Sequence, residues 1–330
     1  MTQKLIGYAA MFEQFAPTPL LDYCQEAESA GFGAIMTSDH FNPWTPRQGQ
    51  SAFVWTWMGA LGRVVSLPFI TGVTPPGYRY HPAIVAQAAA TTAAMYPGRF
   101  TLGLGAGEAL NEHIIGGYWP EPPERVERLF ECIEIIQKLF TGKTVKHTGK
   151  YYKLESARLW TMPETPPPIV VATSGPIVST KTGRLCDGIM TVGAADEKIK
   201  MLLGKFENGA REAGKDPSTM PRILQLHVSW DLTDEAATQN ALDEWPNGGM
   251  NFAKGDLRDP EVFEAMARLV RPEHFAGRVH ISRDPAFHVN LLQHFADMGF
   301  DQIYIHNVGR NQSEFIRFYG QEVLPRVTWR

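Results

Sequence analysis

Short apolar runs alternate with amphipathic segments along most of the chain. Apolar residues recur at helical spacing over 19–30, Gly31 follows at a position typical of a left-handed helix cap, and a second apolar run covers 33–36. A strand, a helix and a strand in succession form a βα unit, and the pattern repeats. The predicted strands are 4–11, 33–36, 69–73, 99–105, 168–172, 188–192, 224–230 and 302–306. The predicted helices are 19–30, 53–65, 82–95, 123–140, 177–186, 197–213, 235–244, 261–270, 285–298 and 312–322.

Repeated strand–helix alternation without an antiparallel run predicts a parallel sheet. At this chain length a closed (β/α)8 barrel, the TIM-barrel architecture of the α/β class, is the simplest arrangement. We expect one domain over 1–330. Residues 245–272 are rich in glycine, asparagine and charge, which predicts an insertion over the barrel mouth. Residues 143–154 are predicted to form a charged surface hairpin.

Composition narrows the class of protein. The 330 residues are 44% hydrophobic, enough for a large core, and the net charge of -4 shows no basic excess for nucleic acid or an anionic membrane. The cysteines Cys24, Cys132 and Cys186 are widely spaced, which favours a reducing cytoplasm. No signal peptide is predicted, and no apolar run reaches the ~20 residues of a membrane span. We therefore expect a cytoplasmic protein.

The first candidate for chemistry is the segment that follows the apolar run at 33–36. Asp39, His40 and Trp44 are delivered together at the carboxyl end of a predicted strand, and Pro43 then breaks the regular structure. In an α/β barrel this end of the strands carries the active site. The alternative is an ordinary loop, in which Asp39 caps a helix and Trp44 packs on the core.

A glycine-rich stretch follows the predicted fourth strand. A dinucleotide-binding GxGxxG pattern fails there, because glycine is required at 108 or 110 and the chain has Glu108 and Leu110. The glycines instead allow backbone to approach a flat ligand, with Glu108 at the strand end. The alternative is a glycine-rich turn with a helix-capping carboxylate.

Two further loops are predicted to line the same mouth. The loop at 72–82 is dense in proline and glycine, which predicts a rigid wall. After the strand at 168–172, Ser174 and Gly175 turn the chain and Pro176 opens a helix, whose free amides suit a phosphate group.

Several chemistries are disfavoured. The ten histidines include no HExxH pattern and no cluster at metal-ligand spacing, so no metal is expected. A Gly-x-Ser-x-Gly elbow and a Walker loop are also absent. Histidines within predicted strands, such as His227 and His306, are expected to be core or rim residues.

Taken together, the chain resembles the deazaflavin-dependent branch of the luciferase-like barrel superfamily, in particular coenzyme F420-dependent glucose-6-phosphate dehydrogenases and their secondary-alcohol dehydrogenase relatives. The resemblance covers nearly the whole chain. The matching motifs are Glu13-Gln14-Phe15-Ala16-Pro17, Ser38-Asp39-His40-Phe41 with Pro43-Trp44, Arg79-Tyr80 with Pro82, Tyr96-Pro97, and Gly105-Ala106-Gly107-Glu108-Ala109-Leu110-Asn111-Glu112.

The resemblance implies roles for these residues. His40 and Glu108 would be the acid/base pair, and Trp44 would brace the reacting centre and contact substrate. The order of proton transfer between His40 and Glu108 stays open. A non-proline cis peptide is implied between Gly72 and Val73, and a homodimer is implied. The implied F420 contacts are Asp39, Gly72, Val73, Thr74, Ala106, Gly107, Asn111, Ser174, Gly175, Ile177 and Val178.

The implied substrate contacts are less complete. Lys254 and Arg278 match two of three phosphate-binding positions, with Glu13 as a further contact. The third position holds Ala195 and a neighbouring threonine position holds Val192; Lys198 and Lys200, just downstream, are the alternatives for the missing lysine. The alternative for Lys254 and Arg278 is solvated surface charge.

The leading hypothesis is an F420-dependent sugar-6-phosphate dehydrogenase that moves hydride from C1 of a hexose 6-phosphate to the deazaflavin. One alternative is an F420-dependent secondary alcohol dehydrogenase, which the missing lysine would allow. A second is an FMN-dependent monooxygenase, and a third is a cofactor-binding barrel without turnover.

Overall fold

Eight parallel strands close into a barrel in the computed structural model, which describes residues 3–252 and 254–329. Around the barrel the order is β11-β1-β2-β3-β4-β7-β8-β9, and β9 pairs again with β11. The predicted (β/α)8 barrel is confirmed; the predicted single domain also spans 1–2, 253 and 330, which lie outside the described residues. The barrel strands are β1 (Leu5–Ala10), β2 (Ile35–Thr37), β3 (Phe69–Thr71), β4 (Phe100–Leu104), β7 (Ile169–Ala172), β8 (Gly188–Val192), β9 (Arg222–Ser229) and β11 (Gln302–Asn307).

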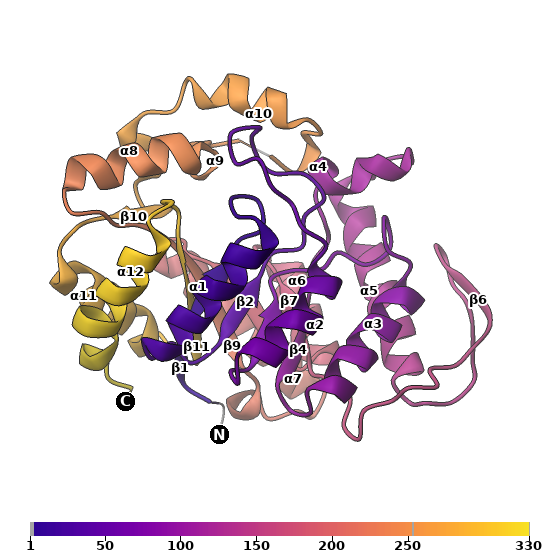
Figure 1. Cartoon of the computed structure of the whole chain (residues 1–330). Helices are drawn as coiled ribbons and strands as arrows, with labels where there is room; N and C mark the ends of the chain where they lie inside the picture. The colour runs from indigo at the N-terminus through magenta and orange to yellow at the C-terminus, as the bar shows by residue number, and fades with distance from the viewer. Residues whose placement is uncertain (1–2, 253, 330) are drawn as a thin grey trace.

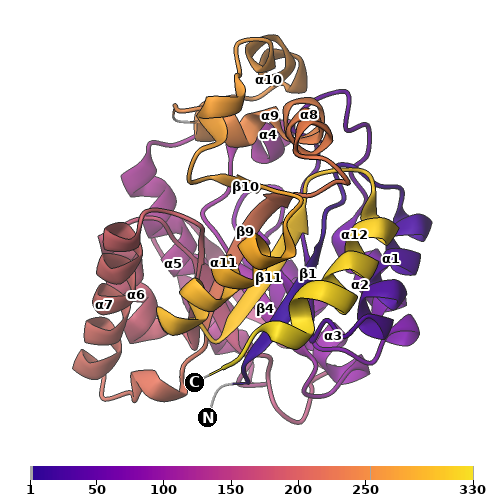
Figure 2. The same ribbon diagram turned by 90° about the vertical axis from the view of Figure 1, so that its left-hand side faces the viewer.

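Helices surround the barrel (Figures 1 and 2). Several begin with proline in their first turn, where the missing N–H breaks no helical hydrogen bond. No described helix is long and apolar enough to cross a membrane. The surrounding helices are α1 (Pro17–Ser29), α2 (Val54–Val64), α3 (Pro82–Met95), α5 (Pro122–Leu139), α6 (Pro176–Leu185), α7 (Asp196–Glu212), α11 (Pro285–Asp297) and α12 (Gln312–Phe318).

A layer of short elements lies above one end of the barrel, between β9 and β11 in sequence (top of Figures 1 and 2). It overlaps the predicted insertion at 245–272 but starts earlier, with α8. Its elements are α8 (Asp234–Glu244), α9 (Pro246–Gly249), η3 (Lys254–Asp256), α10 (Pro260–Ala267), η4 (Pro272–Phe275) and β10 (Val279–Ile281); α4 (Ala109–Glu112) and η1 (His113–Ile115) lie beneath it.

Three details differ from the sequence-based expectation. The strand β10 was not predicted, because His280 interrupts its two apolar residues and Arg278 and Ser282 flank them, so no apolar run marks it. It pairs with the end of β9. The predicted helix 312–322 ends at Phe318 and continues as a π turn (Tyr319–Val323) and a 3-10 turn (Leu324–Arg326), with Gly320 packed closely on Ala30. The hairpin consists of β5 (Val145–Thr148) and β6 (Lys153–Ala157), so it extends three residues beyond the predicted 154.

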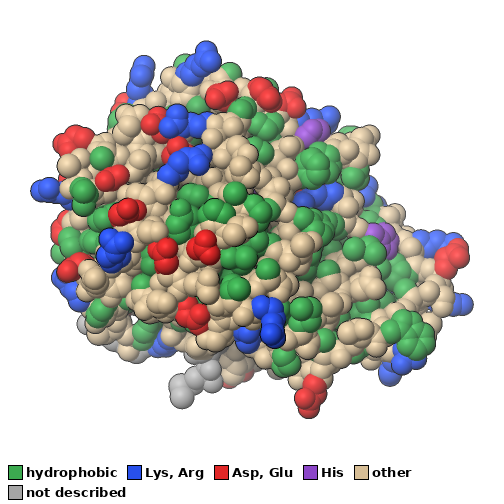
Figure 3. Space-filling view, in the orientation of Figure 1, with side chains coloured by type: hydrophobic (Ala, Val, Ile, Leu, Met, Phe, Trp, Pro, Cys, Tyr) green, Lys and Arg blue, Asp and Glu red, His purple; other side chains and the backbone are tan. Residues whose placement is uncertain are grey.

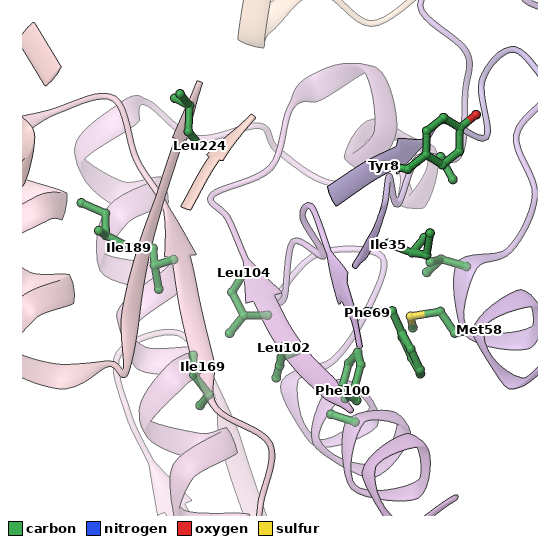
Figure 4. Packing of buried hydrophobic residues seen from close by; sticks show 14 of the residues in the cluster. Tyr8, Ile35, Met58, Phe69, Phe100, Leu102, Leu104, Ile169, Ile189 and Leu224 are labelled. Atoms are coloured by element: carbon green, nitrogen blue, oxygen red, sulfur yellow. The ribbon is translucent and has the colours of Figure 1, made fainter. Parts of the chain in front are cut away.

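The core has two layers, one on each side of the barrel wall. Alternate strand residues such as Leu5, Met36, Ile70 and Tyr304 fill the interior. Strand residues of opposite orientation, such as Ile35, Phe69 and Leu224, pack outward against the helices, and Figure 4 shows them together with Met58 of α2. The outer surface carries charges of both signs with a central group of hydrophobic side chains on the face in Figure 3.

We predict that Gly103→Ala, in β4, destabilises the protein by about 1–3 kcal/mol, a typical cost of overpacking. Gly103 exchanges two 2.9 Å hydrogen bonds with the hydroxyl of Thr71, and an added Cβ would collide with the Thr71 carbonyl oxygen. Gly204→Ala, in α7, is the matched control because its Cβ would meet nothing within 4 Å. Urea denaturation should show Gly204→Ala neutral or stabilised; equal stability of the two variants would contradict this packing.

Candidate active site

A cavity of about 420 Å³ opens at the carboxyl ends of the strands, beneath the layer of short elements. Its volume is within the range of small-molecule sites. The strand ends and following loops of β1 to β4 and β7 to β9 all contribute to its wall. The residues that line it are Met11, Glu13, Ser38, Asp39, His40, Trp44, Gly72, Val73, Pro75, Gly105, Ala106, Gly107, Glu108, Asn111, Ala172, Thr173, Ser174, Met190, Thr191, Val192, Gln225, His227 and Trp245.

His40 reaches the cavity from the loop after β2, and Glu13 lies behind it. The Nδ1 atom of His40 is 3.0 Å from Oε1 of Glu13, although the contact is not an aligned hydrogen bond. The other carboxylate oxygen of Glu13 accepts a 2.8 Å hydrogen bond from Ser38, whose hydroxyl accepts from the backbone N–H of Phe12. Glu13, a predicted substrate contact, therefore lies against the ring of His40, with its carboxylate held by Ser38.

Glu108 reaches the same cavity from the end of β4. It occupies the N-cap position of α4, but its side chain makes no capping hydrogen bond. Its Oε2 atom is buried and has no hydrogen-bond partner among the described residues. Burial raises the pKa of Glu108 above its ordinary 4.5, although the positive charges of His40 and Lys254 act in the opposite direction. The sequence-based alternative of a capping carboxylate is therefore wrong.

Trp44 links His40 to the layer above the barrel. Its ring centroid is 5.3 Å from that of His40, 5.3 Å from Phe263 in α10 and 6.3 Å from Trp245. Trp44 and Phe263 are both buried, so this aromatic contact packs the loop after β2 against α10.

Asp39 is held by a buried ionic network. Its carboxylate accepts hydrogen bonds from Thr74 (2.7 Å), Arg79 (2.9 Å) and Tyr80 (3.1 Å). Arg79 also bonds Glu112 through Nε at 2.9 Å. Burial alone would lower the pKa of Arg79, but the two carboxylates outweigh burial and raise it, so Arg79 stays charged.

The predicted cofactor contacts divide into two groups. Seven of them line the cavity, and the Gly72–Val73 peptide is cis, as the resemblance implied. Thr74 lies behind Asp39. Gly175, Ile177 and Val178 lie at the start of α6, outside the lining, and Ile177 is exposed. The seven in the lining are Asp39, Gly72, Val73, Ala106, Gly107, Asn111 and Ser174.

The two predicted phosphate contacts do not line the cavity. Lys254 Nζ donates to the carbonyl of Asn247 at 2.5 Å, and Arg278 donates to the carbonyl of Met250 at 2.9 Å and to the side chain of Asn251. Lys254 nevertheless lies near Glu108, and burial lowers the pKa of its ammonium group.

Sequence reasoning missed the wall that β9 supplies. Gln225 and His227 line the cavity, and Trp245 lies beside them. The available signal was two polar residues at alternate positions of an otherwise apolar strand. Among residues 3–252 and 254–329, no group of three or more His, Cys, Asp and Glu side chains is arranged to hold a metal ion.

Comparison with known proteins places this site in a family. The sequence model of luciferase-like monooxygenase matches residues 4–302. The chain is 36% identical over 324 residues to an F420-dependent glucose-6-phosphate dehydrogenase of Microbacterium testaceum, covering 97% of this chain and 96% of the relative. It is also 36% identical over 333 residues to F420-dependent glucose-6-phosphate dehydrogenase 2 of Rhodococcus jostii, covering 99% of each.

Solved structures agree. An F420-dependent secondary alcohol dehydrogenase in complex with an F420-acetone adduct superposes with a TM-score of 0.93 at 33% identity, covering 99% of both chains. A coenzyme F420 dependent tetrahydromethanopterin reductase from Methanopyrus kandleri, with a TM-score of 0.80 at 21% identity over 99% of this chain and 100% of the reductase, shares the fold. The chain belongs to the luciferase-like monooxygenase family and, within it, to the F420-dependent oxidoreductases.

Proposed function

We propose that this chain is an F420-dependent dehydrogenase that oxidises C1 of a hexose 6-phosphate, glucose 6-phosphate or a related sugar phosphate, to the lactone, and passes the hydride to C5 of the deazaflavin. The observation that carries the proposal is a single cavity lined by His40 from β2 and Glu108 from β4. Relatives 36% identical over almost their full length are named for this activity.

The cavity wall fits a flat ring. An added Cβ at Gly105 would lie 2.5 Å from the side chain of Val73, so these two residues form a close-packed surface. Gly107 has a φ of +79°, which favours glycine, and leaves backbone exposed to the ligand. Gly175, Ile177 and Val178 begin α6, where free amides suit a phosphate on the cofactor's tail. When bound, F420 supplies the carbon that accepts hydride.

His40 is proposed as the base for the substrate hydroxyl. Oxidation of a carbinol carbon releases the hydroxyl proton as hydride leaves, and histidine, the side chain most often used as a general base, suits this task. Nε2, the ring nitrogen remote from Glu13, would take the proton, and Glu13 would stabilise the resulting charge. Trp44 holds the ring in position.

Glu108 is proposed as the acid of the pair. Burial raises its pKa, so the carboxyl group retains its proton to higher pH than an exposed glutamate. The two carboxylates thus have different tasks, because Glu13 is ion-paired with His40 whereas Glu108 has a buried oxygen with no partner in the described structure.

Lys254 and Arg278 are proposed to bind the substrate phosphate. Both side chains are half-buried, and both donate hydrogen bonds to oxygen atoms of residues 247–251. When a sugar phosphate binds, its charged phosphate would replace these neutral acceptors. A secondary alcohol is the second candidate substrate, because neither cation lines the cavity and Val192 and Ala195 stand at positions that contribute phosphate contacts in the resemblance.

Three broader features are also proposed. One domain carries the whole activity, with 245–272 as its cover over the mouth. A cytoplasmic location is supported by the three free, buried cysteines. A homodimer is supported by exposed apolar side chains at the starts of α2 and α3, where Phe53 and Ile84 are each 55% exposed.

The proposed activity predicts that purified protein bleaches the visible absorbance of oxidised F420 when glucose 6-phosphate is added. His40→Ala should lower kcat at least about a hundredfold, the usual contribution of a general base, while F420 affinity changes less than about threefold. Bleaching with isopropanol alone would favour the second candidate. Flavin-dependent oxygen uptake would favour a monooxygenase, and tight F420 binding without bleaching would favour a non-catalytic barrel.

The phosphate assignment predicts that Arg278→Ala raises KM for glucose 6-phosphate by roughly tenfold or more with little change in kcat, because a charged hydrogen bond is lost. The exposed Arg258→Ala is the matched control and should leave KM within about twofold. An equal change of KM for a sugar phosphate and for a neutral alcohol would contradict the assignment.

The environment of Glu108 predicts a pH-dependent stability gain in Glu108→Gln. A carboxyl whose pKa is raised in the folded state ionises first in the unfolded state, so it destabilises the fold as pH rises above its ordinary 4.5. The Tm of Glu108→Gln should therefore exceed wild type at pH 7.5 and converge with it near pH 4. The control is Glu155→Gln, whose side chain is 83% exposed and whose Tm difference from wild type should change little with pH. A Tm gain of Glu108→Gln that is equal at both pH values would contradict the buried-carboxyl assignment.

A further inference from the structure

Strand β9 presents two polar side chains to the cavity. Gln225 and His227 line it, whereas Leu224, Leu226 and Val228 point the other way and pack into the outer core. Around the barrel, β11 and β1 separate β9 from β2, and His40 follows β2 in sequence. The function argued above uses neither of these polar residues.

His227 is the end of a hydrogen-bonded chain that runs into the barrel. Its Nδ1 lies 2.9 Å from Nδ1 of His306. Nε2 of His306 lies 3.1 Å from Oε1 of Gln14, and the amide nitrogen of Gln14 donates to the carbonyl of Val308 at 2.7 Å.

The donors and acceptors in this series of hydrogen bonds can be assigned in only one direction. The carbonyl of Val308 can only accept, so Gln14 must turn its NH2 group to Val308 and its oxygen to His306. Nε2 of His306 therefore carries a hydrogen. A neutral His306 then has a bare Nδ1, which accepts from Nδ1–H of His227. A neutral His227 with hydrogen on Nδ1 has a bare Nε2.

Both rings are neutral near pH 7. Burial lowers the pKa of His227 to about 3, and the charges of Lys254 and His280 act in the same direction. Burial also holds the pKa of His306 well below its ordinary value, with His227 contributing. Nε2 of His227 makes no hydrogen bond within the described residues, yet it is not among the polar atoms sealed from solvent, so it opens into the cavity that His227 lines.

We propose that Nε2 of His227 accepts a hydrogen bond from a second hydroxyl group of the substrate, distinct from the hydroxyl that is oxidised, and thereby selects polyhydroxylated substrates. The inference rests on the proposed dehydrogenase function and deepens it. His306 and Gln14 are positioning residues, because they fix the tautomer of His227. The series of hydrogen bonds ends at the backbone carbonyl of Val308, so it orients the ring of His227 and does not conduct protons.

The surroundings of His227 suit a sugar. The ring of Trp245 lies 5.0 Å from that of His227 and 6.3 Å from that of Trp44, which places aromatic surface beside the acceptor. Aromatic rings pack well on the C–H faces of a sugar, and the amide of Gln225 can both donate and accept. A simple secondary alcohol has only one hydroxyl and would leave the acceptor unpaired, which a buried site disfavours.

The test uses His227→Phe, which keeps a ring and removes the acceptor. Binding of glucose 6-phosphate is measured by intrinsic tryptophan fluorescence, and turnover by F420 bleaching. We expect Kd and KM for glucose 6-phosphate to rise roughly tenfold, the size expected of one buried hydrogen bond, with kcat within about threefold. His227→Gln, whose amide can donate to His306 and accept from substrate, should recover most of the loss.

Deoxy sugars identify the partner hydroxyl. One of the three sugars 2-, 3- and 4-deoxyglucose 6-phosphate should bind the wild-type protein roughly tenfold more weakly than glucose 6-phosphate does. The same deoxy sugar should bind His227→Phe as tightly as glucose 6-phosphate binds that variant. In addition, the 15N spectrum of histidine-labelled wild type should show His227 with hydrogen on Nδ1, and its bare Nε2 resonance should shift when glucose 6-phosphate is added.

The outcomes separate the two proposals. If wild type turns over glucose 6-phosphate but His227→Phe binds it equally well, or if hydrogen is found on Nε2 of His227, the inference is overturned and the proposed function stands. If wild type neither binds nor oxidises any sugar phosphate, both are overturned.

Discussion

The arrangement of the site depends on one buried guanidinium. Arg79 lies between the carboxylates of Asp39 and Glu112, and all three side chains are at most 6% exposed. The residues come from the loops after β2, β3 and β4, so a single cation holds three strand ends together. Asp39 is adjacent to His40, and Glu112 closes the short helix that begins after Glu108. A buried charge that loses a partner is strongly destabilising, so this network keeps His40, Glu108 and the Gly72–Val73 peptide in fixed relation.

The two glutamates of the cavity have different surroundings. Arg79 is paired with Asp39 and Glu112, and within the described residues it forms no ion pair with Glu13 or Glu108. Glu13 is instead stabilised by His40 and Ser38. Glu108 has only partial compensation from His40 and Lys254, and burial dominates its pKa. Two residues of the same type thus have different surroundings, because Glu13 is paired with His40 and Ser38 whereas one oxygen of Glu108 is buried without a partner among the described residues.

The sequence predicted the parts of the molecule that local pattern determines. Alternation of apolar runs located all eight barrel strands, and the short distance from strand end to His40 or Glu108 placed both at the mouth. The layer above the mouth was harder, because no apolar run marks β10 and the packing of Phe263 on Trp44 joins segments far apart in sequence. Lys254 and Arg278 were expected at the cavity, but nearby backbone carbonyls hold them outside its lining. His227 was expected to be a core or rim residue, since nothing local reveals that its partner is His306.

Substrate choice follows from how the two walls of the cavity are built. The wall from β2, β3 and β4 is tied by the Arg79 network and carries the residues proposed for cofactor and proton transfer. The opposite wall is β9 with the start of the layer that follows it, and it carries Gln225, His227 and Trp245. Lys254 and Arg278 lie in that layer, outside the lining. A change in that second wall alters what can bind without moving His40 or Glu108. The acceptor proposed at His227 falls there, whereas Ala195 follows β8, so the features proposed to set specificity lie on the β8 and β9 side of the cavity, away from His40 and Glu108.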